Sequence, residues 1–318
     1  MYFELDAQQS DFAASIDAAL ASADVPGAVR AWSRGDTAPG GKIWARLADL
    51  GVTALAVPER CAGLGAHPVD LVVALERLGR WCVPGPVTES VAVAPILLGE
   101  DPRCAALASG ELLATVALPP QVPRAVDADI AGLVLIAEAG RVSEAGPGEV
   151  HASVDPSRRL FDVSATGPSW DADVGRAYEF GALATAAQLL GAGQALLGSA
   201  VDYAKQRSQF GRVIGSYQAI KHKLADVHVA VELARPLVYG AALALADHCA
   251  DTARDVSAAK VAASDAALVA ARAALQTHGA IGFTAEHDLS LWLLRVQALR
   301  SAWGDPAAHR RRVLEALT

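Results

Sequence analysis

The chain is poor in the residues that mark several protein classes. Only 5% of its 318 residues are aromatic, and only four are cysteines. No two cysteines form a C-x-x-C pair, and the chain is long enough to fold without disulfides. We therefore expect reduced thiols, no metal site and a cytoplasmic location. The cysteines are Cys61, Cys82, Cys104 and Cys249.

An excess of positive charge is also missing. The formal net charge is −8 and no basic stripe is present, which argues against a nucleic-acid partner. The acidic, polar start MYFELDAQQSDF is not typical of a signal peptide. Residues 181–201 carry no charge over the length of a membrane span. They are rich in Gly and Ala and include Gln188, Gln194 and Ser199, so we expect the centre of a helix bundle and no membrane partner.

What the chain has in abundance is Ala, Leu and Val within a 53% hydrophobic composition, which favours helices. Helices are predicted at 5–21, at 43–50 after a Gly-Gly break, and at 69–80. The last of these is amphipathic. Its polar side is predicted to carry Glu76, Arg77 and Arg80.

Residues 111–165 differ in character from the rest. LLATVAL, GLVLIAE and LFDVSAT are short apolar runs separated by Pro and Gly, which predicts a small β-domain. From Ala177 the pattern is helical to the end, with breaks near Gly211, Gly279 and Gly304, as in an antiparallel bundle. The fold class is thus mainly α with a small β-domain. The expected domains are an N-terminal helical domain at 1–110, a reduced β-domain at 111–168 and a C-terminal four-helix bundle at 169–318.

The most informative segment is DYAKQRSQFGRVIGSYQAIKHKLAD, residues 202–226. Arg207 and Gln218 flank a helix break, and Phe210 lies between them. A guanidinium fork, an amide and an aromatic wall suit a large anionic cofactor with a flat ring system. The alternative is an ordinary surface arginine and a core phenylalanine.

This R-x-x-F-G…Q-x-x-x-x-x-L-A-D pattern resembles the C-terminal helical domain of flavin-dependent acyl-CoA dehydrogenases. GVTALAVPERCAGLG resembles a segment of their N-terminal domain, with Ala62 where a glycine is usual. The resemblance implies FAD, with its diphosphate on Arg207 and Gln218. It also implies that the Q-x-x-G-G counterpart, here QTHGA, closes over the cofactor from a neighbouring subunit. A helix cap followed by a turn is the other interpretation of QTHGA. The candidate cofactor-binding residues are Arg207, Gln209, Phe210, Gln218, Gln276, Gly279 and Ala280.

The resemblance implies oxidation of the Cα–Cβ bond of an acyl thioester. A carboxylate removes the α-proton while the β-hydrogen leaves as hydride to the flavin. The two places where the family carries this glutamate correspond here to Trp303 and Gly181, so the catalytic residue is unknown. Glu179 and Asp305 are the weak candidates nearby.

The family's T-E-P flavin loop is also missing, because the corresponding residues read TVALPP. These losses resemble the reduced subunit of actinobacterial heteromeric (α2β2) sterol-degrading acyl-CoA dehydrogenases. That resemblance implies a partner chain that carries the glutamate, a bulky acyl-CoA substrate and an electron-transfer acceptor. Two alternatives remain: a scaffold subunit without flavin, and a homo-oligomer that uses Glu179 or Asp305. Small residues between Gly181 and Gly198 are expected to leave room for a bulky ligand.

Overall fold

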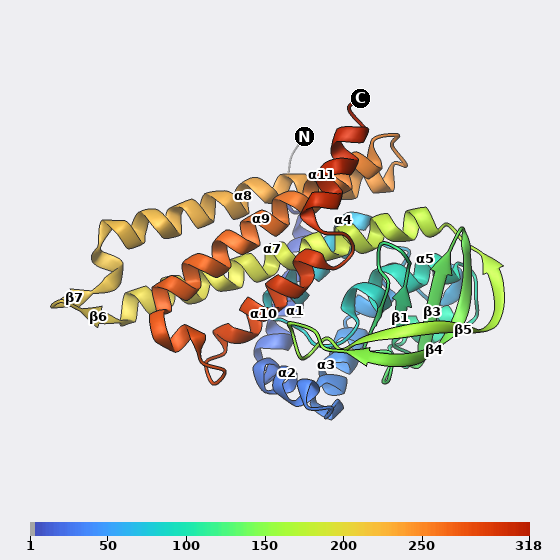
Figure 1. The fold of residues 1–318 in the computed structure, drawn as a ribbon, viewed down its shortest axis with the longest axis horizontal. Coiled ribbons are helices and arrows are strands. Elements are labelled where there is room, and N and C mark those ends of the chain that lie inside the picture. Colours follow the sequence, from blue (N-terminus) through green and yellow to red (C-terminus); the bar gives the residue numbers. More distant parts are fainter. Residues whose placement is uncertain (1–3) are drawn as a thin grey trace.

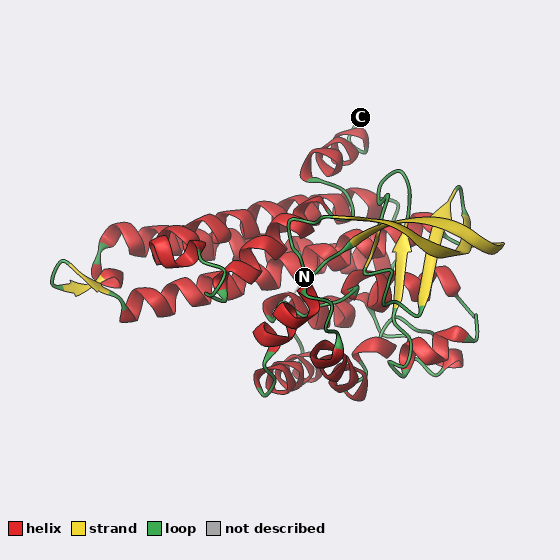
Figure 2. Ribbon diagram, turned by 60° about the horizontal axis from the view of Figure 1, so that its bottom comes forward, coloured by secondary structure: helices red, strands yellow, loops and turns green. Residues whose placement is uncertain are grey.

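The computed structural model describes residues 4–318 and consists of helices, one five-stranded sheet and a short two-stranded hairpin (Figures 1 and 2). The N-terminal helices are α1 Ala7–Ala21, α2 Val25–Ser33, α3 Ala38–Asp49, α4 Pro68–Arg80, α5 Ala94–Leu98 and α6 Arg103–Ala108, with short turns η1 Val52–Ala54 and η2 Glu59–Cys61 and a π-helical turn η3 Thr88–Val93. The predicted helices at 5–21, 43–50 and 69–80 are confirmed. Helix α2 was not predicted, and the Gly-Gly pair lies inside α3 rather than before it.

The sheet follows the N-terminal helices. Its strands are β1 Ala114–Ala117, β2 Ala125–Val126, β3 Leu133–Glu138, β4 Arg141–His151 and β5 Leu160–Asp171. They lie in the order β1-β3-β4-β5-β2, with β1 and β3 parallel and the other pairs antiparallel. The three predicted apolar runs form β1, β3 and β5. Strand β4 was missed because its largely exposed sequence, RVSEAGPGEVH, contains a Gly-Pro-Gly that is typical of a turn.

The C-terminal part is a bundle of long helices. Its elements are α7 Val174–Gln206, the hairpin strands β6 Ser208–Gln209 and β7 Arg212–Val213, the turn η4 Ile214–Ser216, α8 Gln218–Ala246, α9 Thr252–His278, the turn η5 Gly279–Phe283, α10 Leu289–Ser301 and α11 Pro306–Glu315. Helices α7, α8 and α9 run side by side along the long axis (Figure 1). The β6–β7 hairpin lies at one end of the bundle, and the sheet lies at the other.

Two glycines in α7, Gly191 and Gly193, allow this packing. A Cβ on Gly191 would lie 1.8 Å from the backbone oxygen of Glu76 in α4. A Cβ on Gly193 would touch Ala267 of α9 at 3.5 Å. At Gly191 any side chain would therefore force α4 and α7 apart.

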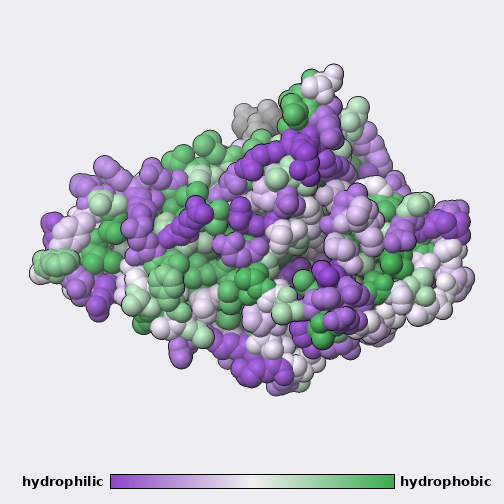
Figure 3. Space-filling view, viewed as in Figure 1, coloured by the Kyte–Doolittle hydropathy of each residue, from purple (hydrophilic) through white to green (hydrophobic). Residues whose placement is uncertain are grey.

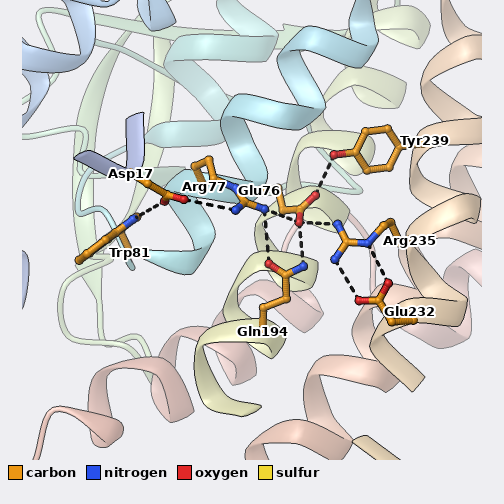
Figure 4. Close-up of polar contacts among 8 residues, drawn as sticks. All are labelled: Asp17, Glu76, Arg77, Trp81, Gln194, Glu232, Arg235 and Tyr239. Carbon is orange, nitrogen blue, oxygen red and sulfur yellow. Dashed lines mark hydrogen bonds and ion pairs between the residues drawn. The ribbon is translucent and has the colours of Figure 1, made fainter. Parts of the chain in front are cut away.

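The prediction that Glu76 lies on the polar face of α4 is wrong, because Glu76 is fully buried. Its carboxylate accepts hydrogen bonds from Arg77 and Arg235, both at 2.7 Å, and from Gln194 and Tyr239, both at 2.9 Å (Figure 4). A buried carboxylate is tolerated only with such partners. Because they come from α4, α7 and α8, Glu76 fastens the N-terminal helices to the bundle.

Two helices are long and apolar enough to cross a membrane by length and composition. In α7 the apolar window is 83% buried inside the protein, which agrees with the predicted bundle centre. In α8 the corresponding figure is 44%. The exposed part of α8 includes Val229, Leu233 and Leu237, which recur every four residues and so share one face. Hydrophobic surface over the bundle is visible in Figure 3.

Candidate functional site

The residues predicted to hold the cofactor diphosphate meet at the hairpin end of the bundle. Helix α7 stops at Gln206, and Arg207 adopts extended backbone that leads into the hairpin. Phe210 sits at the hairpin tip with φ 53° and is 93% exposed. The side chains of Arg207, Gln209 and Gln218 are also exposed. Phe210 is therefore not the core phenylalanine of the alternative interpretation.

The charge of this end is opposite to that of the whole chain. Residues 202–226 hold five basic side chains, Lys205, Arg207, Arg212, Lys221 and Lys223, against two acids, Asp202 and Asp226. Within residues 4–318 none of these five cations forms an ion pair. Gln218 is the first residue of α8, where unpaired backbone N–H groups favour an anion. This set of donors fits a diphosphate.

The structure brings the second predicted motif to the same end. Gln276, in the last turn of α9, accepts a hydrogen bond from the Lys223 ammonium of α8. The next turn begins at Gly279, whose φ of 65° favours glycine. Ala280 follows and is exposed, so its methyl group points at no packed neighbour. Gln218 and Gln276 of a single chain thus lie at the same end of the bundle.

The two positions of the missing glutamate also meet, at the Trp303 end of the bundle. The buried indole of Trp303 packs against Gly181 so closely that a Cβ there would lie 2.1 Å from a ring carbon. Trp303 itself has φ 55°, and its backbone oxygen accepts a hydrogen bond from Tyr178 at 3.3 Å. One aromatic contact therefore fills the space that a carboxylate at either position would need.

Neither weak candidate is free to act as a base. The Glu179 carboxylate is paired with the guanidinium of Arg312, although burial raises its pKa. Asp305 caps helix α11 by accepting the Ala308 N–H at 2.7 Å, and this bond lowers its pKa. A base for an α-proton needs a pKa near neutrality, and Asp305 is displaced in the opposite direction.

The expectation that small residues of α7 leave room for a bulky ligand is wrong at Gly181 and Gly191. Gly181 is covered by the Trp303 indole, and Gly191 by the backbone of α4. The small side chains serve helix packing, because they let neighbouring elements approach α7 closely.

Sequence reasoning missed one buried acid at the Trp303 end. Glu89 lies in η3 and is 1% exposed. Its Oε1 accepts the Trp303 indole N–H at 3.0 Å, while its Oε2 has no partner in the protein. The signal was available, because Glu89 is a lone charge within the apolar run PVTESVAVAPILL.

Comparison with known proteins agrees with the fold. Residues 6–99 match the acyl-CoA dehydrogenase N-terminal domain, and residues 173–318 match the acyl-CoA dehydrogenase C-terminal domain. The acyl-CoA dehydrogenase IpdE2 of Mycobacterium tuberculosis is 34% identical over 298 residues, which cover 91% of this chain and 90% of IpdE2.

Two solved structures share the fold. The ChsE4–ChsE5 complex from Mycobacterium tuberculosis superposes with a TM-score of 0.84 at 21% identity, covering 100% of this chain and 99% of the other. A variant of the Tcur3481–Tcur3483 steroid ACAD also gives 0.84, at 20% identity, covering 98% and 97%. The chain belongs to the acyl-CoA dehydrogenase family. It is accordingly an oxidoreductase.

Proposed function

We propose that the chain is the FAD-binding, reduced subunit of a heteromeric acyl-CoA dehydrogenase that introduces an α,β double bond into a bulky acyl-CoA. The observation that carries the proposal is the packing of Trp303 on Gly181. Because an indole accepts no α-proton, this chain offers no carboxylate at either family position. The catalytic glutamate would come from the partner chain.

The distance between the two ends supports a shared site. Gly181 lies in α7, and Arg207 directly follows its last residue. An α-helix rises 1.5 Å per residue, so the two residues are roughly 40 Å apart. One FAD molecule is too short to touch both. The hairpin end and the Trp303 end of one chain therefore serve different cofactor positions, and the hairpin end needs a second surface to enclose a ligand.

At the hairpin end the chain's own residues would bind and orient. The Arg207 guanidinium would donate two hydrogen bonds to the diphosphate, and Gln218 with the start of α8 would donate to its other oxygens. Phe210 and Gln209 would cover the cofactor, with Gln276, Gly279 and Ala280 on its other side. When bound, FAD supplies the hydride acceptor for the β-hydrogen.

The exposed apolar row on α8, Val229, Leu233 and Leu237, supports assembly with a second chain. The heteromeric form and the bulky substrate agree with the ChsE4–ChsE5 complex and with the steroid ACAD named above. A scaffold without flavin is the second candidate, favoured by the missing T-E-P loop. An electron-transfer acceptor as a partner and the cytoplasmic location stay predictions.

The test is the flavin content of the purified complex when Arg207 is replaced. We expect Arg207→Ala to weaken FAD binding about tenfold or more, because a charge-assisted contact to phosphate is lost. Arg34→Ala is the matched control, since Arg34 is an exposed arginine of the N-terminal domain. Unchanged flavin content in Arg207→Ala would support the scaffold instead. Turnover of acyl-CoA by the pure homomer would contradict the heteromeric proposal.

A further inference from the structure

Two cysteines that are far apart in the chain meet among the N-terminal helices. Cys61 is the last residue of η2, and Cys104 lies in the first turn of α6. Both are free thiols. Their Sγ atoms approach the same backbone oxygen, that of Gly99, at 4.0 Å from Cys61 and 3.6 Å from Cys104. Because both sulfurs face one oxygen atom, they are close neighbours in space.

The surroundings of the two thiols keep their segments together. Turn η2 packs against α6. Gly99, with φ 60° and ψ −105°, makes the turn between α5 and α6 in a conformation that favours glycine. On either side of the thiols, Arg60 Nη2 pairs with a carboxylate oxygen of Glu100 at 2.9 Å. The two segments that carry the cysteines are thus held beside each other in the folded chain.

The two thiols differ in their access to solvent. Cys61 is half-buried, whereas Cys104 is fully buried. Burial raises the pKa of the Cys104 thiol to about 11, and the Cys61 thiol adds to this rise through its charge and a hydrogen bond. A dissolved oxidant therefore meets Cys61 first, while Cys104 stays protonated beside it. An accessible cysteine next to a second one is typical of thiols that oxidise reversibly.

We propose that Cys61 and Cys104 are a peroxide-sensitive pair that forms a reversible disulfide between η2 and α6. The Cys61 thiolate attacks one oxygen of hydrogen peroxide. An S–O bond forms, the O–O bond breaks, and the departing hydroxide takes back the proton that Cys61 had lost. The Cys104 sulfur then attacks the Cys61 sulfenic acid: an S–S bond forms, the S–O bond breaks, and the hydroxyl leaves with the Cys104 proton as a second water. Each cysteine loses one electron, and one peroxide is reduced to two waters.

The disulfide would close a loop that holds important contacts of the fold. Residues 61–104 include α4 with Glu76 and η3 with Glu89, the two buried acids that bond to the bundle. Closing a loop lowers the entropy of the unfolded chain and so stabilises the folded one. Oxidation of this pair thus strengthens the attachment of the N-terminal helices. The reaction needs neither flavin nor a partner chain, so its outcome is independent of the function proposed above.

The test is to treat the folded full chain with a small excess of hydrogen peroxide and to map its peptides by mass spectrometry without reduction. The Cys249→Ser variant is the background, because Cys249 is exposed and would link separate chains. We expect a Cys61–Cys104 peptide pair, lighter by two hydrogen atoms and separated again by dithiothreitol. Cys104→Ala should instead leave a sulfenic acid on Cys61 that dimedone traps. Cys82→Ala, which removes another buried thiol with a pKa raised to about 11, is the matched control and should keep the cross-link.

The thermal unfolding midpoint supplies a second measurement. The oxidised chain should unfold roughly 5 °C higher than the reduced chain, and this difference should be absent in Cys61→Ser. A shared midpoint of the reduced variants shows that each is folded. The proposal would be overturned if the chain formed no Cys61–Cys104 cross-link, if Cys61 were oxidised only to sulfinic or sulfonic acid, or if the midpoint did not rise on oxidation.

Discussion

Polar side chains have opposite surroundings at the two ends of the bundle. At the Trp303 end, most polar groups find partners inside the protein: Lys260 donates to the backbone oxygens of Leu299, Arg300 and Gly304, and His309 bonds to Trp303. At the hairpin end, five basic side chains form no ion pairs inside the described chain, and four of them and the Phe210 ring are exposed. The first arrangement stabilises a fold, whereas the second is suited to binding something else.

The largest effect that would test this contrast is expected at Trp303. Trp303→Ala should lower the free energy of unfolding by roughly 5 kcal/mol, because it empties the space over Gly181 and removes the hydrogen-bond donor of Glu89. Phe210→Ala at the hairpin should change it by less than about 0.5 kcal/mol. Urea unfolding of both variants measures the difference. Equal losses would show that the hairpin is part of the core.

A slightly smaller decrease in the free energy of unfolding is expected when Glu76 is replaced. Glu76→Ala leaves Arg77 and Arg235 without their shared carboxylate and should cost roughly 4 kcal/mol. The matched control is Glu232→Ala, which removes a more exposed acid that pairs with the same Arg235 and should cost less than about 1 kcal/mol. The two unfolding curves compare a buried and a surface ion pair on one arginine. Similar midpoints would mean that Glu76 does not fasten α4 to the bundle.

The smallest of the three effects depends on pH. Burial lowers the pKa of His309 from 6.5 to about 4, and its contacts with Ser257 and the Trp303 oxygen suit the neutral ring. On acidification the unfolded chain gains this proton first, so stability falls as pH drops from about 6.5 to about 4, by up to roughly 3 kcal/mol. Burial raises the pKa of Asp127 to about 6, which acts in the opposite direction below that pH.

His309→Gln isolates the histidine contribution from that of Asp127. The stability difference between wild type and variant should be largest above pH 6.5 and should decrease by up to roughly 3 kcal/mol as the pH falls through about 4. His222→Gln, at the exposed start of α8, is the control and should leave the acid profile unchanged. Denaturant unfolding at several pH values supplies the data. A constant difference across this range would contradict the assignment to His309.

The hairpin motif was readable from sequence because its residues are close together in the chain. Arg207, Phe210 and Gln218 lie within twelve residues, so their spacing and the helix break already placed them at one junction. The small β-domain was also predicted, except for the two-residue β2 and for β4, whose Gly-Pro-Gly is typical of a turn. Both successes depend on local patterns.

What the sequence by itself determined is the helical bundle, the small sheet, the two family motifs and the lack of a glutamate at either usual position. Only the tertiary structure decided that Trp303 covers Gly181, that Glu76 is buried, and that Glu89 and Arg158 share one cavity. Glu89 and Arg158 are 69 residues apart in the chain, and Glu76 is 159 residues from its partner Arg235. No local pattern encodes such contacts, because they form only when α4, α7, the sheet loops and the end of α10 pack together.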